Sequence, residues 1–334
     1  MNKENSRKLK LLKMWEILKQ ETDEKHPIST NELISRLREQ GILVDRKILY
    51  SDIELLNENG YEVLCQRSRS NKYYVMDRSF DVPEVRILMD AVKSAGFITE
   101  KKTESLINKI AMLAGSKRGQ VLKSDVTKFS TVKSNNENIL YIIDTIIEAK
   151  EENKKIAFSY FKYDVNKKKV YKKSKENAEE NKRYIINPVE LVLDNDQYYL
   201  ICYDDKHSNY THYRVDRIDK IEKLDEDLVI YDWVKEKEII KYRSELFSMY
   251  SGEAKEISFV ADKDLLDVIY DKFGDRVSIK VLGEGKIRCN VTIQNSPMLV
   301  AWCCSFTSRL KVESPPSLVK SIKEHLTSTI NQYE

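Results

Sequence analysis

The first 60 residues contain three stretches in which hydrophobic residues recur at the spacing of a helix. The first amphipathic stretch is 7–20. Ser29 and Glu32 then have the spacing of a capping box, in which each side chain binds the other residue's backbone amide, ahead of a short helix. Asp45 can cap a third helix that ends at Gly60. The predicted inner face of this third helix consists of Ile48, Leu49, Ile53, Leu55 and Leu56.

Two short β-like runs, 61–65 and 73–76, follow the third helix and predict a hairpin. Three helices and a hairpin within this length predict a winged helix-turn-helix domain, to which we assign residues 1–78. Residues 79–150 return to helical spacing and are predicted to form a helical linker. Inside this segment, the polar stretch 116–138 contains few apolar residues and is expected to be a linker.

The remainder of the chain changes character twice. Residues 156–224 contain runs rich in Ile, Val, Tyr and Phe, which predict short strands and a small barrel in a domain over 151–228. The last part has the order βαββαβ with a closing helix, which predicts a ferredoxin-like unit over 250–334. The predicted fold class is therefore α+β with several domains.

Composition agrees with a folded protein of more than one domain. Of the 334 residues, 41% are hydrophobic and 33% charged, with nine glycines and six prolines, which excludes collagen-like and largely disordered chains. No run approaches the roughly 20 apolar residues of a membrane span, and the charged N-terminus lacks a signal peptide's apolar centre. Five scattered cysteines without a C-x-x-C pair predict reduced thiols. We therefore expect a cytoplasmic protein that does not bind membranes.

The net charge of +3 is too small to indicate a nucleic-acid partner by itself, but the charges are unevenly distributed. Residues 154–183 contain 11 basic and 4 acidic side chains, whereas residues 1–78 contain 15 and 13. The simplest interpretation of the basic block, above all of its centre at 167–175, is a solvated loop.

The third helix and the hairpin carry the side chains that are expected to bind DNA. With its apolar side inward, the helix exposes a polar flank near its N-terminus, made of Arg46, Lys47, Tyr50 and Ser51. That end of a recognition helix enters the major groove, where arginine can bind guanine and lysine can hold phosphate. The hairpin adds three basic side chains with no acid between them, Arg67, Arg69 and Lys72. The alternative is a helical domain with a solvated charged face.

Signatures of enzymes are scarce. The sequence contains no P-loop, no G-x-S-x-G and no H-E-x-x-H motif. Asp204, Asp205 and His207 could be taken for the metal site of a nucleic-acid-processing enzyme, together with His212. The two histidines are predicted on a turn and on a strand, with no shared face, which argues against a metal. We therefore expect no enzymatic activity, no cofactor and no metal, and keep the nuclease as an alternative.

A short segment of the predicted barrel has the chemistry of an anion pocket. In a strand His212, Arg214 and Asp216 share one face and Arg217 lies on the other, but a bend or strand end would bring both arginines to one site. Two guanidinium groups and a histidine beside a sheet suit phosphate. The alternative is that the two arginines pair at the surface with Asp216 and Asp219.

Three parts of the sequence carry a family resemblance. Residues 198–200 (Tyr-Tyr-Leu) and 213–218 (Tyr-Arg-Val-Asp-Arg-Ile) look like the core of a WYL domain, with Tyr198 where the name-giving tryptophan is usual. Residues 45–53 resemble the helix-turn-helix of the bacterial transcriptional regulators that contain this domain, and residues 312–316 are similar to their C-terminal extension, called WCX. The sequence therefore resembles the WYL-domain family of transcriptional regulators.

The resemblance implies an SH3- or Sm-like barrel that senses a nucleotide or a single-stranded nucleic acid. It also implies a homodimer, with residues 79–150 as the linking and dimerisation segment. The family's ligand-binding residues carry over onto Ser159, Tyr160, His212, Arg214 and Arg217, and Arg183 and Tyr184 are further candidates.

The function that the resemblance implies is a ligand-responsive regulator that binds double-stranded operator DNA, in the cytoplasm and associated with the nucleoid. Repression is favoured over activation. The alternatives are an activator, or an interaction module that contacts RNA polymerase or another protein.

Overall fold

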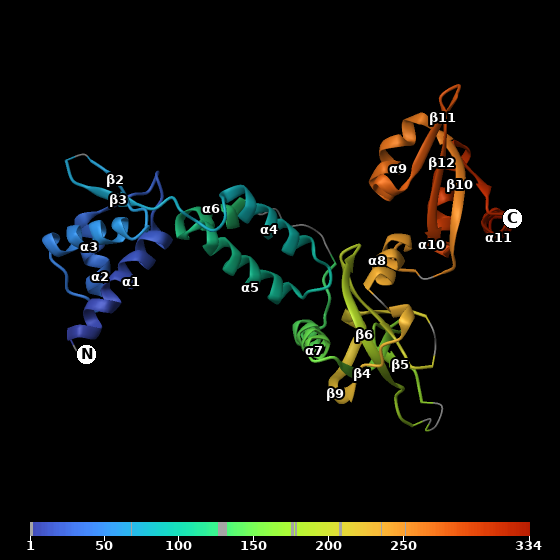
Figure 1. Cartoon of the computed structure of the whole chain (residues 1–334), viewed down its shortest axis with the longest axis horizontal. Helices are drawn as coiled ribbons and strands as arrows, with labels where there is room; N and C mark the ends of the chain where they lie inside the picture. Colours follow the sequence, from blue (N-terminus) through green and yellow to red (C-terminus); the bar gives the residue numbers. More distant parts are fainter. Residues whose placement is uncertain are drawn as a thin grey trace. The chain divides into compact units, whose positions relative to one another are not determined.

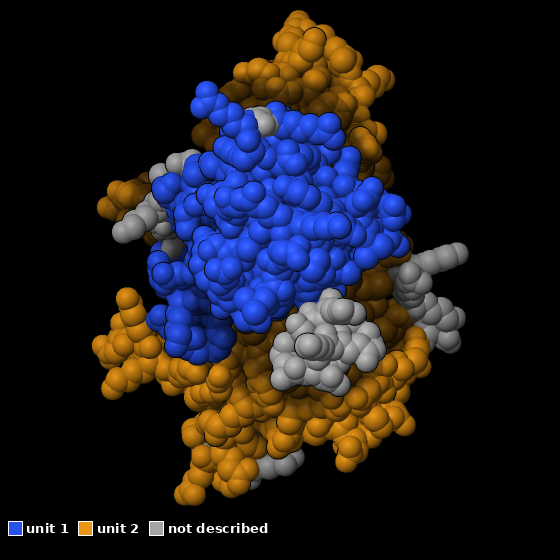
Figure 2. Space-filling view, turned by 90° about the vertical axis from the view of Figure 1, so that its left-hand side faces the viewer, with its two compact units in different colours: residues 1–137 blue, residues 138–334 orange. Residues whose placement is uncertain are grey.

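The computed structural model describes residues 3–67, 69–125, 132–174, 177, 179–206, 209–234, 236–250 and 252–334. The chain divides into two compact units, Met1–Glu137 and Asn138–Glu334, whose elements are labelled in Figure 1 and whose surfaces are coloured separately in Figure 2. Each unit is considered by itself below. Within the described residues, no helix combines the length and the apolar character that crossing a bilayer requires.

The first part of unit 1 is a three-helix core with a small sheet. Its helices are α1 (Lys3–Glu21), α2 (Thr30–Glu39) and α3 (Arg46–Glu58), and its strands are β1 (Ile28–Ser29), β2 (Leu64–Gln66) and β3 (Lys72–Tyr74). The strands are antiparallel in the order β1-β3-β2, so β1, which the sequence did not predict, joins the α1–α2 connection to the hairpin after α3. Buried side chains from all three helices and the sheet form one core, among them Met14, Leu33, Leu37, Leu49 and Tyr73.

The predicted caps of α2 and α3 are confirmed. Ser29 Oγ accepts the Glu32 amide at 3.3 Å while Glu32 Oε2 accepts the Ser29 amide at 2.8 Å, which completes the capping box. Asp45 Oδ1 accepts the amide of Ile48 at 2.9 Å. Local side-chain hydrogen bonds therefore determine where both helices begin.

The predicted inner face of α3 is wrong at two of its five positions. Ile48 and Leu55 are each 44% exposed. Asp52 is buried on the inner side and pairs with Lys10 of α1 at 2.5 Å. A buried ion pair between two helices cannot be recognised from the spacing of hydrophobic residues. A prediction from that spacing alone therefore assigned the wrong residues to the buried face of α3.

Unit 1 continues with a second helical core. Its elements are α4 (Val82–Ser94), α5 (Glu100–Ala111), the 3-10 turn η1 (Met112–Ala114) and α6 (Ser116–Asp125). The predicted linker over 116–138 is therefore wrong where α6 forms. Leu122 packs in the core with Val85 and Met89, and Gly119 lies so close to α5 that a Cβ there would be 2.4 Å from the Ala111 carbonyl oxygen. One buried leucine and one close backbone contact hold α6, and neither produces a periodic pattern.

The chain after α6 is anchored to the end of α4. Lys133 Nζ donates to the carbonyl oxygens of Lys93 at 2.6 Å and Ala95 at 2.8 Å, and the Ser134 amide donates to Gly96 O at 2.9 Å. A lysine ammonium at a helix C-terminus satisfies the last carbonyls and complements the helix dipole. This anchor lies only a few residues before the end of unit 1 at Glu137.

Unit 2 begins with a helix on a sheet. The elements are α7 (Ile139–Glu151), β4 (Lys154–Tyr163), β5 (Lys169–Tyr171), β6 (Arg183–Asp194), β7 (Gln197–Tyr203), β8 (Thr211–Arg214) and β9 (Ile218–Asp227). The strand order is β5-β4-β6-β7-β8, and β9 also pairs with β4. The chain passes from β8 to β9 through one 3-10 turn, η2 (Val215–Arg217). α7 packs against β4, β6, β9 and η2 (Figure 1).

The basic stretch 167–175, which was expected to be a solvated loop, is not wholly a loop because it contains the strand β5.

Residues 229–249, which lie between the two domains assigned from the sequence, cover one face of this sheet. They contain the 3-10 turn η3 (Asp232–Val234) and the helix α8 (Glu236–Glu245). Ile239 of α8 and Met249 pack with Ile201 and Tyr203 of β7 in one buried cluster. The spacing of apolar residues in this segment was too irregular to predict α8.

The C-terminal part of unit 2 has the predicted element order. Its elements are β10 (Ala254–Asp262), η4 (Lys263–Leu265), α9 (Leu266–Phe273), η5 (Gly274–Arg276), β11 (Ser278–Gly283), β12 (Lys286–Gln294), α10 (Pro297–Ser305), η6 (Thr307–Arg309), β13 (Leu310–Ser314) and α11 (Pro316–Ile330). The sheet is antiparallel in the order β11-β12-β10-β13. One core joins the sheet to the helices through Phe259, Phe273, Cys289 and Leu318.

The five cysteines are free, and Cys202, Cys289 and Cys303 are buried. Burial raises the pKa of Cys289 to about 11 and that of Cys303 to about 12. Both thiols are therefore protonated at neutral pH and act as small apolar side chains.

Substitution of Gly119 tests how α6 is held. Gly119→Ala raises helix propensity by about 1 kcal/mol but places a methyl group against the Ala111 carbonyl, so we expect α6 to be loosened. Hydrogen exchange of the full chain should show faster exchange over residues 116–125. The exposed neighbour Gln120→Ala is the control and should leave exchange unchanged or slower. Slower exchange in both variants would contradict the proposed close contact.

Candidate functional site

The polar flank predicted on α3 is exposed. Arg46, Lys47, Tyr50 and Ser51 all lie on the surface of unit 1. Arg46 Nη2 donates to Asn31 Oδ1 of α2 at 2.8 Å. A neutral amide orients the guanidinium without cancelling its charge, so the positive charge of Arg46 remains available to an anion.

The three basic residues of the hairpin differ in their surroundings. Arg67 and Arg69 are exposed on either side of residue 68, which lies outside the described residues. Lys72 is half-buried near the capping box. The pKa of Glu32 is lowered chiefly by its hydrogen bonds with Ser29, and the nearby charge of Lys72 contributes. Lys72 is thus the least exposed of the three, and the two arginines are the exposed cations of the hairpin.

In unit 2, Arg214 is held by a carboxylate at the end of β8. Its Nε and Nη2 donate to the two oxygens of Asp216 at 3.0 and 2.9 Å, and Nη2 also donates to Gln197 Oε1 at 2.9 Å. We name this group the Arg214 clamp. The alternative in which Arg214 pairs with Asp216 is therefore confirmed. This carboxylate largely neutralises the positive charge of Arg214.

Arg217, two residues further on, is not held in this way. Its Nε is buried, and no described residue accepts its proton. Asp219, the other partner considered from the sequence, instead binds the Tyr171 hydroxyl and lies 3.5 Å from Lys169 Nζ. A buried guanidinium nitrogen without an acceptor costs about 1–3 kcal/mol, so such a group calls for an explanation.

Tyr160 lies beside both arginines. Its hydroxyl oxygen accepts the Arg214 amide at 3.3 Å, and Tyr160 is the register partner of Ile218, the residue after Arg217. Burial raises the pKa of Tyr160, and the charges of Arg217 and Arg214 act in the opposite direction. Because its oxygen already accepts a hydrogen bond, Tyr160 retains its proton as a donor. The sharp turn η2 thus brings Tyr160, Arg214 and Arg217 together.

The structure does not bring the other three predicted ligand residues to this place. Ser159 is buried and points to the opposite face of β4 from Tyr160, because neighbouring residues of a strand alternate. Arg183, its register partner on β6, forms an ion pair with Glu222. His212 contacts α8 and the segment after it, as described next.

Both ring nitrogens of His212 have partners. Nδ1 lies 3.0 Å from the carbonyl oxygen of Met249 and must donate to it, so Nε2 accepts from the Tyr242 hydroxyl at 3.0 Å. Burial lowers the pKa of His212, which keeps the ring neutral at pH 7. His212 therefore fastens α8 and the Met249 turn to β8 rather than presenting a charge to an anion.

An aromatic group surrounds Tyr160, in which the sequence singled out Tyr184 as a weaker ligand candidate but did not single out Phe158 or Tyr213 as ligand contacts. Tyr213 packs edge-on against Phe158 and Tyr160, each with ring centroids 5.1 Å apart, and Tyr184 lies 5.4 Å from Tyr213. Gln197 of the Arg214 clamp was also missed. Their residue types are common in strands, and only the alternation of β4 and the register of β6 and β7 could have placed them.

Of the residues considered for a nuclease, Asp205 serves the sheet instead. Asp205 pairs with the buried Lys155 at 2.8 Å and accepts from Asn187 Nδ2 at 2.8 Å, and the Lys155 hydrogen bond lowers its pKa. His207 lies outside the described residues. No group of three or more His, Cys, Asp or Glu side chains suited to a metal occurs in the described part of the chain.

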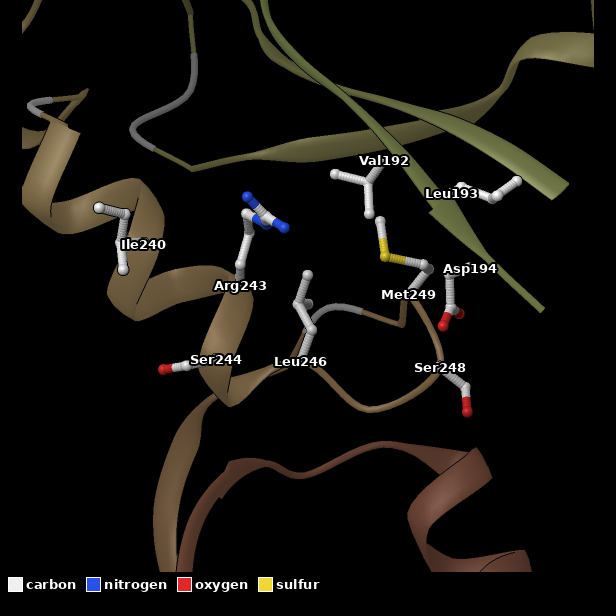
Figure 3. A pocket seen from close by; sticks show the side chains of 9 residues that line it. All are labelled: Val192, Leu193, Asp194, Ile240, Arg243, Ser244, Leu246, Ser248 and Met249. Carbon is white, nitrogen blue, oxygen red and sulfur yellow. The ribbon is translucent and has the colours of Figure 1, made fainter. Parts of the chain in front are cut away.

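A separate cavity of about 390 Å³ lies between the end of β6 and α8 (Figure 3). Its lining residues are Val192, Leu193, Asp194, Ile240, Arg243, Ser244, Leu246, Ser248 and Met249. Arg243, its one cation, donates to Glu190 at 2.8 Å. None of the predicted ligand residues lines this cavity.

Comparisons with known proteins concern both the domain and the whole chain. Two solved structures align with nearly all of this chain at 14% identity. The proteasome accessory factor B/C (PafBC) of Arthrobacter aurescens covers 97% of this chain with a TM-score of 0.30, and this chain spans about half (49%) of its length. A CRISPR Cas-related protein covers 98% of this chain, with 84% of its own length and a TM-score of 0.39. The curated proteins contain no significant match.

The match to a protein family is local and specific. It covers residues 141–223, which include most of α7, strands β4 to β8, the turn η2 and the first part of β9. The Arg214 clamp, Tyr160 and Arg217 all lie inside it. The resemblance predicted from the sequence is thereby confirmed for this segment, and residues 141–223 match the WYL domain.

Proposed function

We propose that this protein is a transcriptional regulator in which unit 1 binds operator DNA and the WYL domain senses an anion of the phosphate type. The observation that carries the proposal is the buried, unpartnered Nε of Arg217 beside the Tyr160 hydroxyl. In this proposal the protein acts by binding, without catalysis.

The DNA-binding part of the proposal rests on α3. We propose that residues 1–78 form a winged helix-turn-helix in which the exposed flank of α3 reads the major groove and the β2–β3 hairpin contacts phosphates or the minor groove. Arg46 supports this role because Asn31 orients it without neutralising it. The exposed Arg67 and Arg69 are suited to the backbone.

The ligand part rests on two hydrogen-bond donors for which the described part of the chain supplies no acceptor. Arg217 Nε and the Tyr160 hydroxyl both have a proton to donate, and a phosphate oxygen accepts from such groups with short, charge-assisted bonds. An anion there relieves the cost of the buried nitrogen, which favours the occupied state. We therefore propose Tyr160 and Arg217 as ligand contacts, with Arg214 as the residue that shapes the turn. Ser159, Arg183 and His212 stay as predictions from the resemblance.

Helix α7 offers a physical route from the ligand to unit 1. It packs against η2, which contains Arg217, and Lys223 of β9 ties to it through Glu148 at 2.5 Å and Glu152 at 2.7 Å. Only residue 138 separates its start from the end of unit 1. A ligand that binds one position of η2 more tightly than another shifts the equilibrium between arrangements of α7.

The finer fold and assembly complete the proposal. We propose an SH3- or Sm-like barrel for the WYL domain, with α7 as part of it, and a ferredoxin-like WCX domain over residues 250–334. A homodimer with two recognition helices spaced by one DNA turn, in part through residues 79–137, is the proposed assembly. We favour repression, with the ligand releasing the operator.

The role of α3 predicts a loss of specific DNA binding on substitution. Arg46→Ala should weaken binding to an operator selected from random duplexes by about 1–3 kcal/mol if Arg46 binds a guanine. The measurement is fluorescence anisotropy at fixed salt. Arg38→Ala on α2 removes an equally exposed arginine and should change the affinity little. Equal losses in the two variants would indicate a charge effect without base contact.

The role of Arg217 predicts a separation of ligand binding from DNA binding. Arg217→Ala should abolish calorimetric binding of AMP or a 12-nucleotide single strand while leaving operator affinity unchanged. Tyr160→Phe should weaken the same binding about three- to tenfold, since one hydrogen bond to the anion is lost. Arg288→Ala, which removes an arginine paired with Glu313 and outside the predicted ligand residues, is the matched control. If Arg288→Ala and Arg217→Ala behave alike, the anion binds elsewhere.

A further inference from the structure

The cavity between β6 and α8 is lined mainly by apolar side chains. Val192 and Leu193 come from β6, Ile240 comes from α8, and Leu246 and Met249 follow that helix. Figure 3 shows Val192, Leu246 and Met249 directed toward the same space. Leu193 and Ile240 are 56% and 58% exposed, so the apolar surface reaches the rim of the cavity. With a volume of about 390 Å³, the cavity falls in the range of small-molecule sites, which is roughly 300–1,000 Å³.

Two of the lining residues, Ser248 and Met249, form a strained turn. Both have a positive φ, of 54° and 55°, and they lie between Phe247 and Tyr250, which form an antiparallel bridge. Two left-handed residues in a row are typical of a turn made of Asn and Gly, because a Cβ is disfavoured in that conformation. Strain of this kind persists only where the surroundings impose it, and it is concentrated at ligand sites and switch regions.

Contacts in two directions hold this turn. The Met249 carbonyl oxygen accepts from His212 Nδ1 at 3.0 Å, and the Met249 side chain packs with Ile201 and Tyr203 of β7. Phe247, at the start of the turn, belongs instead to the core that includes the C-terminal sheet. A molecule in the cavity contacts Met249 and therefore acts on a turn that joins two cores of unit 2.

The charged groups at the cavity favour an uncharged ligand. One N–H group of Arg243 donates to Glu190 at 2.8 Å, and no described residue accepts from its other N–H groups. The carboxylate of Asp194 also lines the cavity. Two carboxylates around one guanidinium give a net negative charge, which repels an anion, and an alkyl ammonium offers no acceptor to Arg243. A neutral acceptor can bind the remaining N–H groups while Glu190 stays in place.

We propose that this cavity binds a small uncharged molecule with an apolar body and one carbonyl group as hydrogen-bond acceptor. The apolar body packs against Val192 and Met249, and the carbonyl oxygen accepts from the N–H groups of Arg243 that do not bind Glu190. An occupant in contact with Met249 stabilises the strained turn. The proposal does not rest on the proposed anion site, whose residues lie outside the lining of this cavity.

The first test compares two competitors with the same apolar body. The full chain is titrated with N-phenyl-1-naphthylamine, an uncharged dye whose fluorescence rises in apolar surroundings, and the dye is then displaced with octanamide or octanoate. Octanamide should displace the dye at a concentration about tenfold lower, because the carboxylates at the cavity repel octanoate. Equal potency of the two competitors, a preference for octanoate, or no displacement by octanamide would contradict the proposed ligand chemistry.

Two double variants of equal composition locate the bound dye. Leu193→Ser/Ile240→Ser removes the apolar rim of the cavity, and Leu326→Ser/Ile330→Ser removes the same residue types from α11. All four side chains are exposed, so neither variant should unfold. The rim variant should bind the dye about tenfold more weakly, since apolar contact area is lost, and the α11 variant should bind it like the wild type. Equal affinities in the two variants would place the dye elsewhere and overturn the proposal.

Arg243→Lys tests the contact to the carbonyl group. Lysine keeps a positive charge beside Glu190 but lacks the guanidinium fork, so octanamide should bind about three- to tenfold more weakly, relative to the variant's own affinity for the dye. In the wild type, octanamide should also slow hydrogen exchange over residues 246–250, because it stabilises the turn. Unchanged octanamide affinity in Arg243→Lys would overturn the assigned contact, and unchanged exchange over 246–250 would overturn the action on the turn.

Discussion

The ion pair between Arg214 and Asp216 is the constraint on which the proposed ligand site depends. It closes over two residues at the end of β8, with both carboxylate oxygens engaged and Gln197 as a further partner. The chain is thereby fixed in the turn η2, and Arg217 falls on the same side as Tyr160 instead of on the opposite face of an extended strand. The clamp uses one arginine as structure and leaves the other with a donor that no described residue satisfies.

This division also bears on the route by which the proposed ligand would act on the rest of the chain. η2 is the one covalent connection between β8 and β9, and it packs against α7, which follows unit 1 after a single residue. Before α7 in the chain, Lys133 fastens the end of unit 1 to the last carbonyls of α4. A shift of η2 therefore reaches a chain segment that is fastened on both sides. Because this connection is short and held at both ends, it favours transmission of a displacement of η2 toward unit 1.

How much the sequence could predict depended on the range of the interactions involved. Local chemistry was predicted well: the Ser29–Glu32 capping box, the Asp45 cap and the βαββαβ order all follow from neighbours in the chain. Contacts between distant residues were not. Asp52 is inward because Lys10 meets it, and α6 exists because Gly119 fits against Ala111. Ser159 and His212 were placed near Arg217 by resemblance, but strand alternation and the bonds to Met249 and Tyr242 direct them elsewhere.

A count of charges is therefore a poor guide to binding in this chain, and the pairing of each charge is a better one. The basic block has a local excess of seven positive charges, yet several of its cations are already committed to Asp205, Asp219 and Glu222. A cation that is paired with a carboxylate of the protein must give up this partner before it binds a ligand. Its net contribution to the free energy of ligand binding is therefore small. A cation above an aromatic ring, such as Lys182 over Tyr184, is oriented without being neutralised. By the same reasoning, Arg217 is a better candidate for binding an anion than Arg214, whose guanidinium is paired with Asp216. The capacity to bind anions is therefore expected where the geometry leaves a cation without a carboxylate partner, whatever the local composition.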